Sequence, residues 1–166
     1  MRDLSLHILD IAENSAAADA TAVSIGISIN LTTDRLALWV SDNGRGMDPD
    51  TVRQVTDPFY TSRTTRKVGL GIPLFQAAAE SCNGSLQVDS LPGAGTRVQA
   101  DFQHSHIDRM PLGDLSSTAL TLLIAHPDIH WRFVYQTLPA AGPLQEFEFD
   151  DAPVKEILDG VPLTDP

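Results

Sequence analysis

The spacing of apolar residues predicts a compact set of alternating helices and strands. Residues 4–18 place apolar side chains every three to four positions, which predicts a helix that Asp3 can cap. Apolar residues then alternate with small or polar ones at 23–29 and 36–40, which indicates two paired strands. The elements predicted next are helices at 49–56 and 72–82 and strands at 86–90 and 96–102. We expect an α/β (α+β) two-layer sandwich: a mixed sheet with these helices on one face.

A second pattern begins after the last of these strands. It predicts a helix at 114–125, strands at 131–137 and 145–149, and a short helix at 154–158. We therefore divide the chain into a domain at 1–103 and a small C-terminal α/β appendage at 104–166. The apolar faces of the appendage must be covered. They pack either against the free face of the sheet or against a second copy, which would make a homodimer, or a partner protein.

Composition and charge narrow the classes of function. The 166 residues carry 22 acidic and 11 basic side chains, a net charge of −11, which argues against nucleic-acid binding. No apolar run approaches the about 20 residues of a membrane helix, so we expect no membrane partner. The single cysteine, Cys82, cannot form an internal disulfide, and the N-terminus has no signal-peptide pattern. These features favour a cytoplasmic location.

Two polar motifs accompany the first helix and the strand at 36–40. His7, Asp10 and Asn14 share one stripe of the helix, which is either its solvent face or part of a site. The sequence Asp-Asn-Gly-Arg-Gly-Met at 42–47 follows the strand directly. Its glycines permit close approach of a ligand, and Asp42 can accept a hydrogen bond from an exocyclic amine. A hairpin turn is the alternative, but the next segment reads as helix rather than strand.

Two glycine-containing motifs follow in the second half of the domain. Gly-Leu-Gly at 69–71 opens the helix at 72–82 after three basic residues, Arg63, Arg66 and Lys67. Helix N-terminal N–H groups and nearby cations can bind phosphate, although a flexible loop gives the same pattern. Gly-Ala-Gly-Thr at 93–96 leads into the last strand and by itself indicates only a turn.

In this order, the four motifs resemble the conserved boxes of the Bergerat-type (GHKL) ATPases. That superfamily includes gyrase, heat-shock chaperone and mismatch-repair ATPases and the catalytic domains of histidine kinases. The resemblance covers residues 4–102, and the segment Asp-Pro-Phe-Tyr-Thr-Ser-Arg at 57–63 is most similar to a histidine-kinase catalytic domain with a short lid. It implies the Bergerat ATP-binding fold, with ATP and Mg²⁺ as cofactors.

The resemblance also implies a role for individual residues. Asn14 would bind magnesium, Asp42 would contact the adenine amine, and Gly44 and Gly46 would form the pocket floor. Thr96 would support the adenine site. The remaining nucleotide-binding residues implied are Met47, Phe59, Arg63, Lys67, Gly69, Leu70 and Gly71. Asp10 stands where hydrolysing members carry a catalytic glutamate, and its shorter side chain leaves a role as general base in doubt.

Three functions remain open. The first is a kinase that phosphorylates a partner protein in trans, because the helical hairpin that presents a phosphoacceptor histidine in sensor kinases is missing from this sequence. The second is a slow ATPase that uses Asp10. The third is a regulatory module in which ATP orders the lid and switches partner binding without turnover. His104 and His106 form a poor metal site, since no cysteine or carboxylate pair accompanies them.

Overall fold

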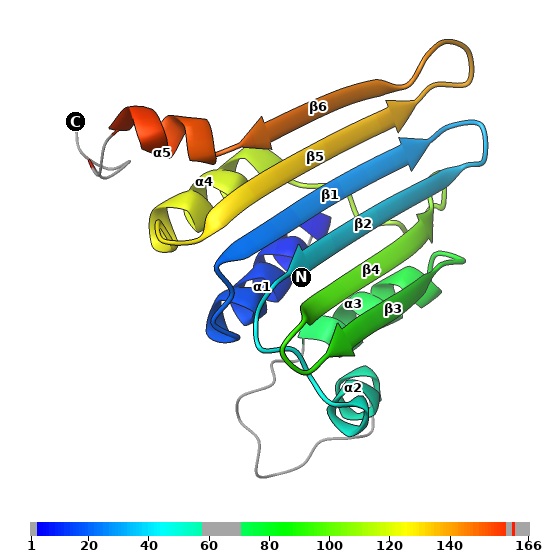
Figure 1. Ribbon diagram of the computed structural model, residues 1–166. Helices are drawn as coiled ribbons and strands as arrows, with labels where there is room; N and C mark the ends of the chain where they lie inside the picture. Colours follow the sequence, from blue (N-terminus) through cyan, green and yellow to red (C-terminus); the bar gives the residue numbers. More distant parts are fainter. Residues whose placement is uncertain (1–2, 58–70, 159–160, 162–166) are drawn as a thin grey trace.

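The computed structural model describes residues 3–57, 71–158 and 161 of the chain. Within these residues the predicted order of helices and strands is confirmed, with boundaries shifted by one or two positions (Figure 1). The elements are α1 (Leu4–Ala17), β1 (Ala22–Asn30), β2 (Arg35–Asp42), α2 (Pro49–Thr56), α3 (Gly71–Glu80), β3 (Ser85–Leu91), β4 (Gly95–Gln103), α4 (Leu115–Ala125), β5 (His130–Leu138), β6 (Gln145–Asp150) and α5 (Ala152–Leu158).

Aspartate caps begin three of the helices. Asp3 accepts a hydrogen bond from the Leu6 N–H at the start of α1, and Asp114 accepts one from the Ser117 N–H at the start of α4. Asp48 caps α2 just before its first-turn proline, and the Thr51 N–H that it accepts lowers the pKa of its carboxyl. Each cap satisfies backbone donors that have no partner within the helix, so these residues set where the helices begin.

Six strands form one open mixed sheet in the order β3-β4-β2-β1-β5-β6. Neighbouring strands are antiparallel except for β1 and β5, which are parallel with Val23 opposite Trp131. In the register of β2 and β4, Asp42 lies opposite Thr96 and Val40 opposite Val98. Two of the sequence motifs therefore meet at the same end of two adjacent strands.

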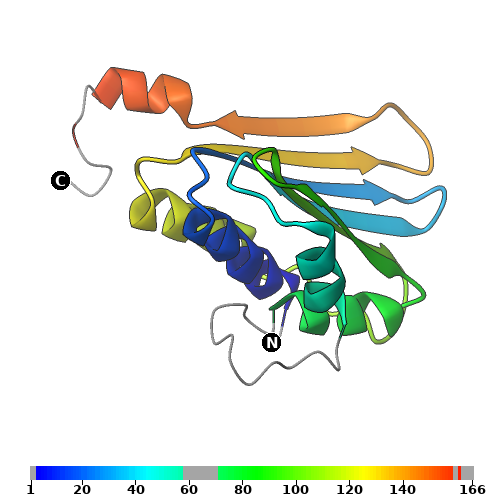
Figure 2. The same ribbon diagram turned by 60° about the horizontal axis from the view of Figure 1, so that its bottom comes forward.

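The C-terminal segment does not cover the free face of the sheet, which was one of the two arrangements expected from the sequence. Instead β5 and β6 lengthen the sheet beyond β1, and α4 packs beside α1 on the helical face (Figures 1 and 2). Leu122 and Trp131 are both fully buried in the same core as α1 and β1. Pairing with β5 covers the backbone edge that β1 would otherwise expose. The division of the chain at residue 103 stays a prediction.

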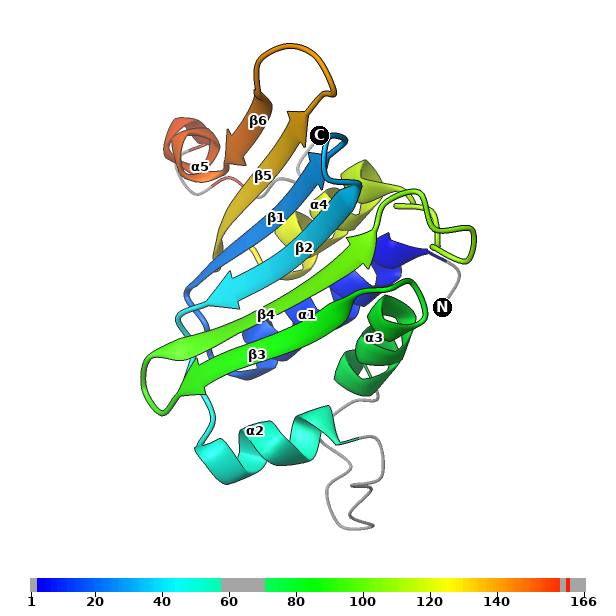
Figure 3. The same ribbon diagram turned by 90° about the vertical axis from the view of Figure 1, so that its right-hand side faces the viewer.

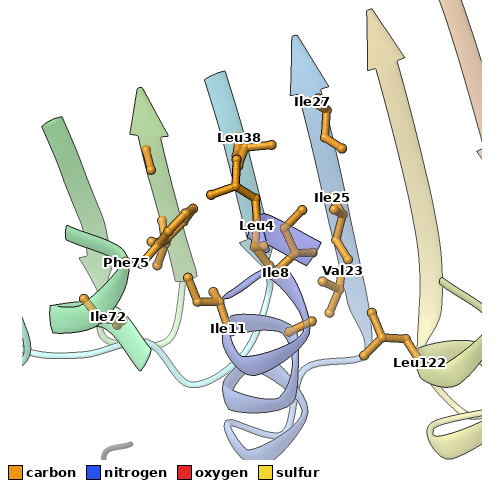
Figure 4. Packing of buried hydrophobic residues seen from close by; sticks show 14 of the residues in the cluster. Leu4, Ile8, Ile11, Val23, Ile25, Ile27, Leu38, Ile72, Phe75 and Leu122 are labelled. Carbon is orange, nitrogen blue, oxygen red and sulfur yellow. The ribbon is translucent and has the colours of Figure 1, made fainter. Parts of the chain in front are cut away.

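The hydrophobic core lies between the sheet and the helices. Figure 4 shows Ile8 and Ile11 of α1 pointing toward Ile25 and Leu38 of the central strands, with Phe75 of α3 beside them. Helices α1 to α4 all lie on this side of the sheet (Figure 2). No helix in the described part of the chain is long and apolar enough to cross a membrane.

Candidate functional site

A pocket of about 450 Å³ lies where α1, α2 and the start of α3 meet the ends of β2 and β4. Figure 3 shows α2 below the sheet, at the β3 and β4 side, and Thr51 and Val55 of α2 line the pocket. Its lining is mainly apolar, with a few polar groups. The lining residues used below are Ile11, Asn14, Ser15, Val40, Asp42, Gly46, Met47, Val55, Ile72, Thr96 and Val98.

Asp42 and Asp48 both line this pocket, and three protein groups hold the Asp42 carboxylate in place. Its Oδ1 accepts hydrogen bonds from the Gly44 N–H at 2.8 Å and the Thr96 N–H at 3.2 Å. Its Oδ2 accepts one from the Ser15 hydroxyl at 2.6 Å. A carboxylate has about four lone-pair positions, so one position on Oδ2 is left for a donor in the pocket. The site therefore presents a fixed acceptor beside apolar side chains such as Val40 and Val98.

Two glycines let the loops beside Asp42 pass close to each other. Gly46 has φ +67°, and a Cβ there would lie 1.9 Å from the Leu91 carbonyl oxygen. Gly95 has φ +93°, and its Cβ would lie 1.9 Å from the Asp42 carbonyl oxygen. Both positions combine left-handed backbone with contact against another chain segment, so only glycine fits. The glycines in the two motifs thus bring the loop after β2 against the β3–β4 turn.

Ser90 connects the two loops through hydrogen bonds. Its hydroxyl accepts the Met47 N–H at 2.8 Å, lies 2.8 Å from the Thr96 hydroxyl and donates to the Gly95 carbonyl at 3.0 Å. This network holds the two chain segments whose residues Met47 and Thr96 line the pocket. Sequence reasoning missed Ser90, because one serine at the end of a strand carries no motif.

The structure brings together most of the predicted site residues that it describes. Asn14, Asp42, Gly46, Met47 and Thr96 all line the pocket, and Gly44 donates its N–H to Asp42. The predicted nucleotide-binding residues Phe59, Arg63, Lys67, Gly69 and Leu70 lie outside the described residues. The binding roles of all these residues stay predictions.

Asp10 and Gly71 lie next to each other, but neither lines the pocket. A Cβ on Gly71 would lie 2.1 Å from Asp10 Oδ2, so the carboxylate rests against the backbone of the first residue of α3. Asp10 thus sits one helical turn from Asn14, beside the point where the predicted lid would join α3. This arrangement places Asp10 at the edge of the site.

His7 continues the polar stripe of α1 away from the pocket. Its ring is 2% exposed and stacks on Phe75 with a centroid distance of 4.9 Å. Its buried Nδ1 has no hydrogen-bond partner among the residues that the structure describes. Burial lowers the pKa of His7, which favours the neutral imidazole. His7 therefore packs α1 against α3.

The other four histidines are half-buried or exposed and do not line the pocket. His126 Nε2 lies 3.0 Å from Glu13, and His130 Nε2 lies 2.9 Å from Asp150. His106 Nδ1 accepts the Asp108 N–H, and the carbonyl of His104 accepts from Arg109. Among the described residues that line the pocket, none is a histidine.

Sequence reasoning also missed Ser15, Val40 and Val98. Ser15 belongs to the same helix as Asn14, but nothing in the spacing predicts its bond to a carboxylate 27 residues away. Val40 and Val98 could have been found, because strand alternation places each on the same face as Asp42 and Thr96.

The residues present fit a flat base that carries an exocyclic amine. Val40, Met47, Val55 and Val98 supply apolar contact for a ring, and Asp42 supplies the acceptor. Asn14 adds an amide oxygen, a group suited to Mg²⁺, on the α1 wall. The described part of the site thus combines apolar side chains with a carboxylate acceptor and one amide oxygen.

Comparison with known proteins agrees with this geometry. Residues 2–106 match the family described as histidine kinase-, DNA gyrase B- and HSP90-like ATPase. The sensor protein kinase FleS of Pseudomonas aeruginosa is 39% identical over 89 residues, covering 54% of this chain and 22% of FleS. A probable C4-dicarboxylate sensor kinase of Bacillus subtilis is 32% identical over 104 residues, covering 60% of this chain and 19% of the kinase. The chain thus spans about a fifth of the length of these relatives.

A solved structure shares the fold over almost the whole chain. The ATPase domain of Aquifex aeolicus MutL, determined with ADP, superimposes with a TM-score of 0.51 at 15% identity. The superposition covers 96% of this chain and 68% of the MutL chain, so it includes most of the C-terminal segment. With its open mixed sheet, its pocket and the family match over residues 2–106, the chain belongs to the histidine kinase-, DNA gyrase B- and HSP90-like (GHKL) ATPases.

Proposed function

We propose that the chain binds Mg-ATP in the pocket around Asp42. The observation that carries the proposal is the acceptor position left on Asp42 Oδ2 once Gly44, Thr96 and Ser15 have taken the others. There it accepts a hydrogen bond from the adenine amine, while Met47 and Val98 contact the ring. Asn14 holds the magnesium ion, which neutralises phosphate charge when bound.

We propose further that the bound ATP serves to phosphorylate a partner protein. The matched relatives are named as sensor kinases, which supports kinase chemistry. None of the five histidines of the chain lines the pocket, which supports an acceptor on another molecule. Positioning and electrostatic stabilisation dominate such phosphoryl transfer.

Incubation of the pure protein with labelled Mg-ATP tests action in trans. We expect no acid-labile phosphate on the protein itself, because no histidine reaches the pocket. Labelling that disappears in the His104→Ala, His106→Ala double variant would contradict the proposal and make this segment the acceptor. ATP-dependent binding of a partner without phosphate transfer would favour a regulatory module instead.

A slow ATPase is the second candidate function, and the rate of ATP hydrolysis would depend on the position of Asp10. The carboxylate rests against Gly71 instead of lining the pocket, and it is one methylene shorter than glutamate. A carboxylate that lies about 1.5 Å too far from the attacking water lowers the rate of hydrolysis roughly a hundredfold where positioning governs that rate. We expect barely detectable hydrolysis that Asp10→Glu accelerates. Steady phosphate release in the wild type, abolished by Asp10→Asn, would instead establish the ATPase.

A further inference from the structure

A second hollow, of about 390 Å³, lies on the other side of α1 from the nucleotide pocket. Helix α4 forms one wall through Ala119 and Leu123, and Phe133 and Phe149 of β5 and β6 form the floor. We call it the α4–β6 groove. The nucleotide pocket and the groove share α1, since Ile11 lines the first and Ile8 the second.

The α4–β6 groove is apolar and open at its rim. Leu120 on α4 is 55% exposed, and Phe147 on β6 is 65% exposed. Both line the groove from opposite sides. Figure 1 shows that β6 is the outermost strand of the sheet, so no further strand borders its outer edge in the described part of the chain. Apolar rims of this kind mark interaction sites more often than isolated exposed residues do.

The backbone of β6 can pair with a further strand. The Asp151 N–H donates to the Trp131 carbonyl at 3.1 Å, and orientations alternate along an antiparallel ladder. The backbone groups of Glu146 and Glu148 therefore point away from β5, toward the open edge. An incoming strand would lengthen the sheet to seven strands and extend the floor of the groove beyond Phe147.

The charges on β6 determine which charged side chains the incoming strand can carry. Side chains alternate along β6, so Glu146 and Glu148 lie on the sheet face opposite Phe147. Glu148 pairs with Arg132 at 2.6 Å, and Glu146 accepts a hydrogen bond from the neutral Gln136 at 2.5 Å. A second copy of β6 would set glutamates beside glutamates, which destabilises a strand pair. The chain's net charge of −11 adds to that repulsion.

We propose that β6 and the α4–β6 groove bind an extended segment of a partner protein with alternating apolar and basic residues. Main-chain hydrogen bonds to the β6 edge supply register, as in other complexes formed by strand addition. Apolar side chains of the segment enter the groove beside Phe147 and Leu120. Its basic side chains lie on the other face, beside Glu146. This interaction does not require nucleotide in the pocket around Asp42.

Two synthetic peptides of about ten residues test the proposal by fluorescence anisotropy on the full chain. One alternates lysine with valine, and the other alternates glutamate with valine. We expect the lysine peptide to bind at least tenfold more tightly, because each basic side chain gains an opposite charge across the strand pair. When this peptide binds, the largest changes in the amide signals of the protein in NMR spectra should be at residues of β5, β6 and α4.

Variants of β6 separate the contributions of charge and groove. Glu146→Lys should weaken the lysine peptide about threefold to tenfold and strengthen the glutamate peptide. Phe147→Ser should weaken both, and circular dichroism checks that it is folded, as expected for an exposed side chain. Glu80→Lys is the matched control, since it makes the same charge change on the exposed end of α3 and should leave binding unchanged.

Three results would overturn the proposal. The first is binding of neither peptide at millimolar concentration. The second is equal affinity for both peptides, which would show that Glu146 does not select charge. The third is concentration-dependent dimerisation that Phe147→Ser abolishes, which would show that a second copy occupies the groove.

Discussion

Asp42→Asn isolates the acceptor on which the nucleotide proposal depends. Asparagine keeps Oδ1, so the Gly44 and Thr96 N–H groups retain their partner. The new amide replaces Oδ2, and the Ser15 hydroxyl can turn to accept from it. The fold should therefore be preserved, while the position that faced the pocket changes from acceptor to donor.

The size of the effect follows from that exchange. Leaving a hydrogen bond to a charged group unmade costs about 1–3 kcal/mol, or about fivefold to 150-fold in affinity. We expect calorimetry with Mg-ADP to show that loss. The inosine analogue carries a carbonyl oxygen in place of the amine, so it should bind the wild type weakly and bind the variant more tightly, because its carbonyl can accept from the new amide.

Asp89→Asn is the matched control for this experiment. It makes the same chemical change at an exposed position on β3, outside the residues described as lining the pocket, and should leave ADP affinity unchanged. Equal affinity of the wild type for the adenine and inosine nucleotides, or unchanged ADP binding in Asp42→Asn, would refute the assignment of Asp42 to the amine.

Three further predictions concern stability, each measured by urea unfolding. Gly46→Ala should lower the free energy of unfolding by about 1–3 kcal/mol or more. Gly93→Ala should lower it less, because Gly93 has a similar φ but nothing lies within 4 Å of the added Cβ. Burial lowers the pKa of His7 in the folded state, so the free energy of unfolding should fall as pH drops below about 6.5. His7→Phe should reduce that fall, and an unchanged pH dependence in this variant would contradict the role of His7. Trp131→Ala should cost about 3–5 kcal/mol, and a smaller loss would mean that residues 104–166 fold apart from the core.

The elements of the fold could be predicted because their signals are local. Aspartate caps, strand alternation and the proline after Asp48 each act over a few residues, and the structure confirms the elements that they predict. The strand order could not be read in the same way. Apolar alternation at 131–137 shows that one face is buried, but it does not say that β5 pairs with β1.

The residues of the candidate site also differ in whether local sequence patterns could identify them. Asp42, Gly46 and Thr96 stand in recognisable motifs, and the register of β2 and β4 brings these motifs together. Ser15 and Ser90 complete the network through contacts between segments far apart in the sequence, so local patterns could not identify them. The apolar contacts of Val40 and Val98 follow from strand alternation once the pairing is known.

An NMR titration of the full chain with Mg-ADP tests the central claim most directly. We expect saturable binding of one nucleotide per chain, with the largest amide shifts at Gly44, Met47 and Thr96, which surround Asp42. We also expect Asp42→Asn to reduce these shifts at the same nucleotide concentration. An absence of saturable shifts, or shifts that centre on β5 and β6 while those three amides stay unchanged, would contradict the claim.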